Sequence, residues 1–165
     1  MRIIRTGFPL GAGSLALLSA SLLAACASPP QAQQGSVTGG GSAAELGCTL
    51  RSHCVNSLGV GSLNPLRYEG SPAQALTTLQ STVATFAEAQ VISSEPLAMV
   101  VIFTTPAGFR DEVDFRIDAA AQRIHFRSRS LFGLFDFGKN RSRMEAFSVR
   151  FEQQRRATQH TGSPA

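Results

Sequence analysis

The sequence has little charge, and it lacks the short motifs that identify most enzyme families. Only 16% of its 165 residues are charged, whereas 43% are hydrophobic. This length is typical of one domain, and this apolar fraction excludes a chain that is disordered throughout. No Gly-x-Ser-x-Gly elbow is present, and the three histidines do not combine with serine and aspartate into a convincing triad. Asp136-Phe137-Gly138 matches a kinase tripeptide, but the other kinase motifs are missing.

Charge is also absent from a long N-terminal segment, which indicates an exported protein. Arg2 and Arg5 precede residues 6–26, which carry no charge and are mostly apolar. A basic start followed by an apolar run is typical of a secretory signal. The run ends in Leu23-Ala24-Ala25-Cys26, which resembles the lipobox of bacterial lipoproteins. That resemblance implies diacylation of the Cys26 thiol and cleavage before it, so residues 1–25 are expected to be a lipoprotein signal peptide.

A transmembrane anchor and an ordinary cleaved signal are the alternatives for this segment. Residues 6–25 are long enough to cross a bilayer, but they include Pro9, Gly11 and Gly13. We therefore expect a protein anchored by lipid on Cys26 in the cell membrane or the outer membrane. Its folded domain would face the periplasm.

The next segment has no charge either, and its composition predicts a flexible tether. Residues 27–44 are mostly Ser, Gly, Gln, Ala and Pro, which cannot bury enough apolar surface to fold. The lipidated Cys26 and this tether are expected to occupy residues 26–45. The glycines at 39–41 do not form a phosphate loop, because no Lys-Ser or Lys-Thr follows them.

Two further cysteines, Cys48 and Cys54, enclose five residues. In an exported protein, a disulfide that closes this short loop is the favoured interpretation. Metal binding with His53 as a third ligand is the alternative, but a clear fourth ligand is missing. No metal and no cofactor are expected.

Residues 46–156 show the patterns of a single α+β domain. Ser71-Pro72-Ala73-Gln74 predicts a helix start, since Ser can cap the helix and Pro suits its first position. Leu76, Leu79, Val83 and Phe86 then recur on one helical face. Strands are expected at 98–105, 112–118 and 123–130, with a further short strand at 91–95.

A second helix is expected to follow the strands. Asn140 would cap it, Met144, Phe147 and Phe151 would face the core, and Arg155 and Arg156 would end it. Residues 157–165 would form a disordered tail. The fold class is therefore α+β, with an antiparallel sheet of three to four strands and two helices packed on it.

The last two strands predict their own pairing. With a four-residue connection, the numbers of paired residues sum to 241, so Asp118 faces Arg123 while Phe115 meets Phe126. Asp114 then faces Arg127, and Glu112 faces Arg129. The basic residues of this strand are thus neutralised by acids, which excludes nucleic acid as the expected partner.

Three segments of this domain resemble the bacterial domain-of-unknown-function family 1499. They are Cys48 to Ser57, Phe109 to Phe115, and the run that holds Arg127-Ser128-Arg129-Ser130, Gly133, Asp136, Gly138, Asn140-Arg141 and Arg143. The resemblance covers roughly residues 46–153 and departs at Leu131, where the family usually has Arg. The family has no settled activity, so the resemblance implies a fold and domain boundaries.

A candidate anion or ligand site lies around the last strand and the start of the final helix. Helix N–H groups and arginines there can bind a carboxylate or phosphate. Its candidate residues are Asp111, Arg127, Ser128, Ser130, Asp136, Asn140, Arg141 and Arg143. The structural alternative pairs Asp136 with Arg141 or Arg143 and leaves Asn140 as a cap. Phe132, Phe135 and Phe137 would either form an exposed patch for a partner or lipid, or pack under the loop.

Three classes of function remain. The leading one is a non-catalytic binding or accessory module of the cell envelope, anchored to the membrane through Cys26. Its further partner would be an envelope protein or an anionic ligand. A scaffold without a small ligand and a hydrolase that uses Asp111 and Asp136 are the alternatives, and no catalytic residue is assigned.

Overall fold

The computed structural model describes residues 43–133 and 135–161. The expected signal peptide, the lipidation site at Cys26 and most of the expected tether lie outside the described residues. Within the described part of the chain, no helix has the length and apolarity needed to cross a membrane.

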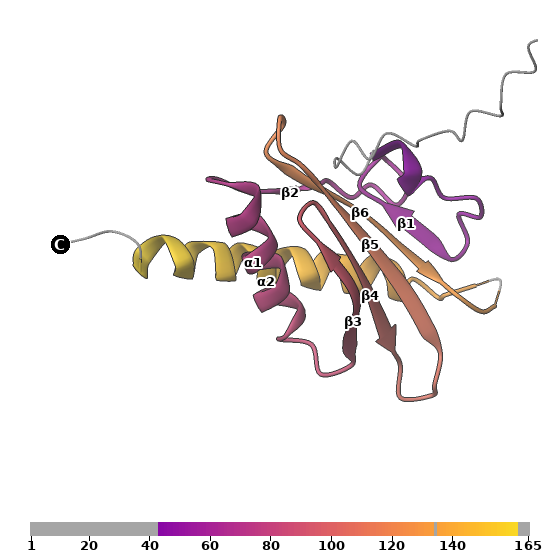
Figure 1. Cartoon of the computed structure of the whole chain (residues 1–165). Helices are drawn as coiled ribbons and strands as arrows, with labels where there is room; N and C mark the ends of the chain where they lie inside the picture. The colour runs from indigo at the N-terminus through magenta and orange to yellow at the C-terminus, as the bar shows by residue number, and fades with distance from the viewer. Residues whose placement is uncertain (1–42, 134, 162–165) are drawn as a thin grey trace, which may run out of the picture. The chain divides into compact units, whose positions relative to one another are not determined.

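Six antiparallel strands form one sheet in the order β1-β6-β5-β4-β3, and β2 also pairs with β6 (Figure 1). In chain order, the elements are η1 (Ala43–Leu46), β1 (Cys54–Asn56), β2 (Leu66–Arg67), α1 (Pro72–Val83), β3 (Ala89–Glu95), β4 (Ala98–Thr104), β5 (Arg110–Asp118), β6 (Arg123–Ser130) and α2 (Lys139–Thr161). The α+β class with an antiparallel sheet and two helices is confirmed. The expected three to four strands are too few, because β1 and β2 have 3 and 2 residues and are too short to show alternation.

The β5–β6 hairpin has the predicted register. The expected pairs are all present: Asp118 with Arg123, Ile117 with Ile124, Phe115 with Phe126, Asp114 with Arg127, and Glu112 with Arg129. Arg127 Nη2 lies 2.7 Å from Asp114 Oδ2, and Arg129 Nη2 lies 2.6 Å from Glu112 Oε1. Arg127 and Arg129 of β6 are therefore paired with acids of β5, on the face opposite the apolar pairs.

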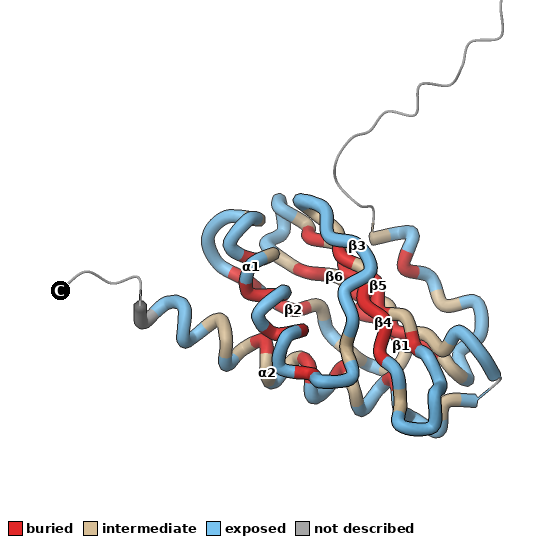
Figure 2. Tube along the Cα trace, turned by 60° about the horizontal axis from the view of Figure 1, so that its bottom comes forward, coloured by how far each residue is buried: buried red, intermediate tan, exposed pale blue. Residues whose placement is uncertain are grey.

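Both helices contribute to one core on the apolar face of the sheet. Figure 2 shows buried positions along the central strands and on both helices. The core joins Leu79 of α1, Phe147 of α2 and Phe115 of β5, and the rings of Phe115 and Phe147 have centroids 5.0 Å apart. The buried residues of this core cluster run from Val55 to Phe151. Among the described residues, both helices and the sheet thus share one core.

Helix α1 begins as the sequence predicts. The Ser71 hydroxyl accepts a bond from Gln74 N at 3.2 Å, and the Gln74 side chain accepts one from Ser71 N at 2.8 Å. This capping box satisfies two N–H groups that the helix itself cannot pair. Leu79 and Val83 are buried on the sheet side.

Helix α2 differs from the prediction at both ends. Asn140 is not the cap; it lies inside the helix and is fully buried. The Asp136 carboxylate takes the capping role, since it accepts bonds from Gly138 N at 3.0 Å and from Asn140 N at 2.9 Å. The helix also continues through residues 157–161, which are therefore not a disordered tail. Gln159 Nε2 donates to Glu69 Oε2 at 2.8 Å, which holds this last part against the β2–α1 loop.

The expected tether also ends earlier than predicted, because Ala43–Leu46 form η1. This turn packs on the outer face of β5 and β6. Arg127 Nη1 donates to the carbonyl oxygens of Glu45 and Gly47, each at 3.2 Å. Leu46 is fully buried, and its carbonyl accepts a bond from Asn56 Nδ2 at 2.8 Å. These contacts order a segment whose composition alone predicts a flexible chain.

Candidate functional site

A buried polar network joins β5, β6 and the first turns of α2. The Ser130 hydroxyl donates to Asp111 Oδ1 at 2.6 Å and accepts from Asn140 Nδ2 at 3.1 Å. The Ser128 hydroxyl donates to Asn140 Oδ1 at 2.6 Å. Arg143 donates to Asn140 Oδ1 at 3.0 Å and to Asp111 Oδ2 at 2.6 Å. We call these five residues the polar network.

Local sequence positions each member of the network. Ser128 and Ser130 alternate with the outward arginines of β6, so their hydroxyls point toward α2. Asn140 and Arg143 are three residues apart and therefore share one face of the helix. Gly138 adopts a φ of 77° immediately before α2, a conformation that glycine accepts without strain. The turn that starts the helix thereby brings Asn140 beneath β6.

The network is closed, because its polar atoms bind one another. The side chains of Arg143 and Asp111 are only 9% and 5% exposed. The guanidinium of Arg143 also lies 4.9 Å from the centroid of the Phe103 ring. Both Asp111 oxygens accept hydrogen bonds within the network. A buried ion pair of this kind holds elements in place only when all its groups are satisfied, which is the case here.

The remaining candidate residues do not join the network. Arg127 lies on the outer face of the sheet and pairs with Asp114. Arg141 is exposed on α2 and pairs with Glu145 at 2.9 Å. Asp136 caps α2 through its backbone contacts, so the expected pairing of Asp136 with Arg141 or Arg143 is wrong. The acid that pairs with Arg143 is Asp111 instead.

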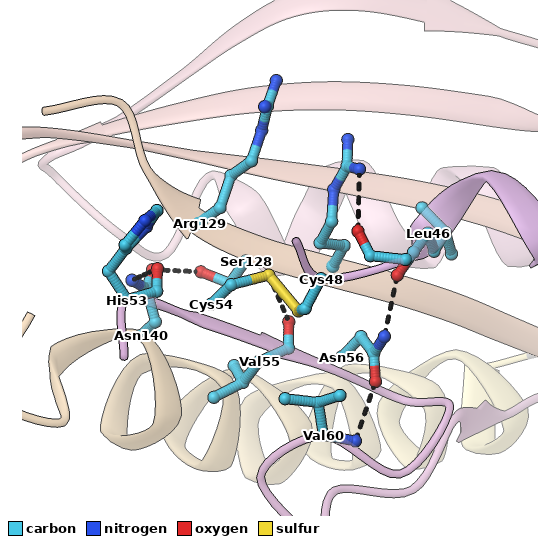
Figure 3. The surroundings of a disulfide bond; sticks show 12 residues. Leu46, Cys48, His53, Cys54, Val55, Asn56, Val60, Ser128, Arg129 and Asn140 are labelled. Atoms are coloured by element: carbon cyan, nitrogen blue, oxygen red, sulfur yellow. Dashed lines mark hydrogen bonds between the residues drawn. A yellow bond between two sulfur atoms is a disulfide. The ribbon is translucent and has the colours of Figure 1, made fainter. Parts of the chain in front are cut away.

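The short cysteine loop is closed by a disulfide and docks on the network (Figure 3). Cys48 and Cys54 are bonded, as expected, with Cα atoms 5.7 Å apart. The carbonyl oxygen of His53 accepts bonds from Asn140 Nδ2 and Ser130 N, both at 3.0 Å. The backbone of His53, rather than its ring, is thus the contact that this loop makes with the network. The two sulfurs bind each other and are not available together as metal ligands; no metal-binding cluster occurs among the described residues.

A second feature of this region is a group of exposed aromatic side chains. Phe109, Phe132, Phe135 and Phe137 are 56%, 79%, 69% and 95% exposed, and we call them the exposed phenylalanine cluster. Of the two alternatives for the last three, exposure is correct and packing under the loop is wrong. All four line a hollow of about 630 Å³ between the β4–β5 turn and the β6–α2 loop.

The hollow is lined by both apolar and polar residues. Pro106 and the cluster line its sides, and Asp111 and Ser130 line it from the network. Since the polar atoms of Asp111 are engaged elsewhere, the hollow mainly presents aromatic surface. The patch predicted from the sequence does not include Phe109, because it stands alone in a turn where no alternation singles it out.

Comparison with known proteins places the chain in a family. Residues 25–151 match the family described as "Protein of unknown function (DUF1499)", and the chain belongs to that family. The match starts before the described domain, at the residue preceding Cys26. No curated protein and no solved structure matches the chain.

The residues that carry the family resemblance are mainly those that join β6 to α2. Ser128, Ser130, Asn140 and Arg143 form the network, and Asp136 caps the helix. The packing of this region therefore accounts for these five residues of the pattern. The exposed phenylalanine cluster is not explained by packing.

Proposed function

We propose that the protein is a lipid-anchored lipoprotein of the cell envelope whose folded domain is a non-catalytic binding module. The N-terminal apolar run and the Leu-Ala-Ala-Cys motif support the anchor. The Cys48–Cys54 disulfide supports an oxidising compartment such as the periplasm. Together these features favour a domain held outside the cytoplasm at a membrane surface.

The observation that carries the binding role is the exposed phenylalanine cluster around its hollow. Soluble domains rarely expose several large aromatic side chains together, and such patches are typical of binding surfaces. The polar network does not offer an equivalent site, because its charges are paired and buried. The bound partner would therefore meet aromatic surface rather than a cluster of arginines.

The two alternative functions have less support. A hydrolase would need a carboxylate able to take or give a proton near substrate. Both oxygens of Asp111 and both oxygens of Asp136 already accept hydrogen bonds. A scaffold function without a ligand does not account for the exposed aromatic hollow.

Blocking lipoprotein signal peptidase in living cells tests the anchor. The unprocessed precursor is expected to accumulate, and labelled fatty acid is expected to attach to the wild type but not to Cys26→Ala. Ser28→Ala serves as the matched control, since it leaves the motif intact and should be labelled normally. Labelling of Cys26→Ala, or processing unaffected by the inhibitor, would contradict the proposal.

A further inference from the structure

We propose that the exposed phenylalanine cluster docks the domain on an anionic lipid surface. The proposal rests on the envelope function above, because that function places a bilayer near the domain. The cluster lies where three loops meet: the cysteine loop, the β4–β5 turn and the β6–α2 loop. Asp136 N donates to the Ser52 carbonyl at 3.4 Å, and Leu131 N donates to the Arg110 carbonyl at 3.0 Å, so the three loops are joined.

The shape of the cluster fits a surface better than a small ligand. Phe137 is 95% exposed and Phe132 is 79% exposed, so both rings project from their loop with little packing against the domain. Phe137 also has a φ of 52°, a left-handed conformation that bulky residues rarely adopt. A bilayer, by contrast, can receive several projecting rings at once, and aromatic side chains favour that environment.

Charge around the cluster favours anionic lipid. Arg51, Arg110 and Lys139 are exposed on the loops that carry or adjoin the phenylalanines. The neighbouring acids are mostly engaged: Asp111 is buried against Arg143, and Asp136 binds backbone N–H groups. Glu88 is exposed and lines an adjoining hollow with Lys139, so the balance of exposed charge is positive.

The same charge disfavours a second copy of the chain as the occupant. A symmetric dimer through this surface would bring the same patch of each copy together. The basic residues of one copy would then lie near those of the other, and this like-charge contact costs binding energy. An anionic bilayer instead attracts each basic residue, by about fivefold in affinity per residue near the surface.

The length of chain before the domain allows this orientation. Residues 27–42 separate the expected lipid anchor from Ala43, and an extended chain of this length spans up to ~55 Å. Helix α2, with 23 residues, is about 35 Å long. The extended tether is thus longer than the longest helix of the domain. The lipid anchor can therefore stay in the bilayer while the end of the domain that carries the phenylalanines faces the same bilayer.

Vesicle binding by the domain without its lipid tests the proposal. The protein used is residues 27–165 with the disulfide formed, which lacks only the expected signal peptide and the lipidated Cys26. The chain has no tryptophan, so Phe137→Trp provides a single reporter. With vesicles of equal parts phosphatidylglycerol and phosphatidylcholine, its fluorescence is expected to shift to the blue. Val149→Trp is the matched control: Val149 is 60% exposed and lies about 15 Å further along α2, so it should not shift.

Sedimentation with the same vesicles measures the contributions of the side chains. Phe137→Ser is expected to weaken partitioning roughly tenfold, because one buried aromatic ring is lost. Arg110→Gln with Lys139→Gln is expected to weaken it by a similar factor or more, whereas Val149→Ser should bind as the wild type does. Circular dichroism confirms that each variant is folded.

Several results would overturn the proposal. They are absence of binding at every lipid concentration, equal binding to pure phosphatidylcholine, and a Phe137→Ser variant that binds as well as the wild type. A dimer in solution that Phe137→Ser dissociates would assign the surface to a second copy instead. These results are independent of lipid attachment at Cys26, so failure here and failure of the lipoprotein proposal are distinguishable.

Discussion

At the scale of single residues, Asn140 has a larger role than its position in the sequence indicates. Its amide accepts bonds from Ser128 and Arg143 and donates bonds to Ser130 and to the His53 carbonyl. One buried side chain thereby connects β6, α2 and the cysteine loop. An asparagine near a helix start predicts a cap, and only the folded structure shows that Asp136 fills that role.

Replacing Arg143 tests how much the polar network contributes to the stability of the fold. Arg143→Leu is expected to lower the free energy of unfolding by about 3–5 kcal/mol, because Asp111 would stay buried without its partner. Arg141→Leu, on the same helix, should cost no more than about 0.5 kcal/mol, since its pair with Glu145 is exposed. Urea unfolding of the oxidised protein measures both.

The double variant Asp111→Leu/Arg143→Leu separates charge from packing. It is expected to recover part of the stability that Arg143→Leu loses, because no unpaired charge remains buried. Equal losses for Arg143→Leu and Arg141→Leu would contradict the central position of the network.

At the scale of elements, the β5–β6 hairpin and the two helices follow from local patterns to different extents. The hairpin has charges matched on one face and apolar residues on the other, so a slip by one residue would break both sets. Helix α1 carries its capping box within four residues of sequence. The end of α2 has no such local signal, because it depends on contacts with Glu69, which is distant in sequence.

The last turns of α2 should respond to acid. Arg155 and Arg156 donate hydrogen bonds to Glu152 and lower the pKa of its carboxyl from 4.5 to about 2. Because this pKa is lowered by folding, the stabilisation is present above pH 4.5 and is lost as the pH falls toward about 2.

Thermal unfolding between pH 6 and about 2 measures this effect. The Tm of Glu152→Gln is expected to lie below that of the wild type near pH 6, and the difference should shrink as the pH falls through this window. Glu145→Gln, on the same helix, is the control. A difference between Glu152→Gln and the wild type that stays constant down to pH 2 would show that the pairing does not stabilise the fold.

At the scale of the whole molecule, the disulfide links the start of the domain to its sheet. Cys54 begins β1, whereas Cys48 follows η1 on the outer face. The six-residue separation of the two cysteines makes the closed loop small. Even so, the loop supports the network through the His53 carbonyl, and its Ser52 carbonyl accepts a bond from the N–H of Asp136, which caps α2.

Loss of this disulfide is expected to destabilise the domain moderately. Chain entropy alone predicts about 2 kcal/mol for a loop of this size, so the Cys48→Ala/Cys54→Ala variant should unfold at lower urea concentration. In protein isolated from cells, neither thiol should react with a maleimide until reductant is added. Reaction without reductant would contradict the disulfide and the oxidising compartment that it indicates.

The sequence by itself determines those features that depend on neighbouring residues. Alternation and charge matching are sufficient for the β5–β6 register, and the Ser-Pro-Ala-Gln pattern is sufficient for the start of α1. The spacing of Met144, Phe147 and Phe151 likewise predicts the buried face of α2, and all three are buried. The strands β1 and β2 escape prediction because strands of two or three residues carry no periodic signal.

The tertiary structure alone decides what the polar candidate residues do. Eight residues appear as one candidate site in the sequence. In the structure, five of them form the polar network, Asp136 caps α2, and Arg127 and Arg141 form ion pairs outside the network. The partner that Arg143 meets, Asp111, depends on contacts between segments far apart in the chain. Folding likewise leaves the four phenylalanines exposed, because they lie in the β4–β5 turn and the β6–α2 loop, outside the strands and helices that form the core.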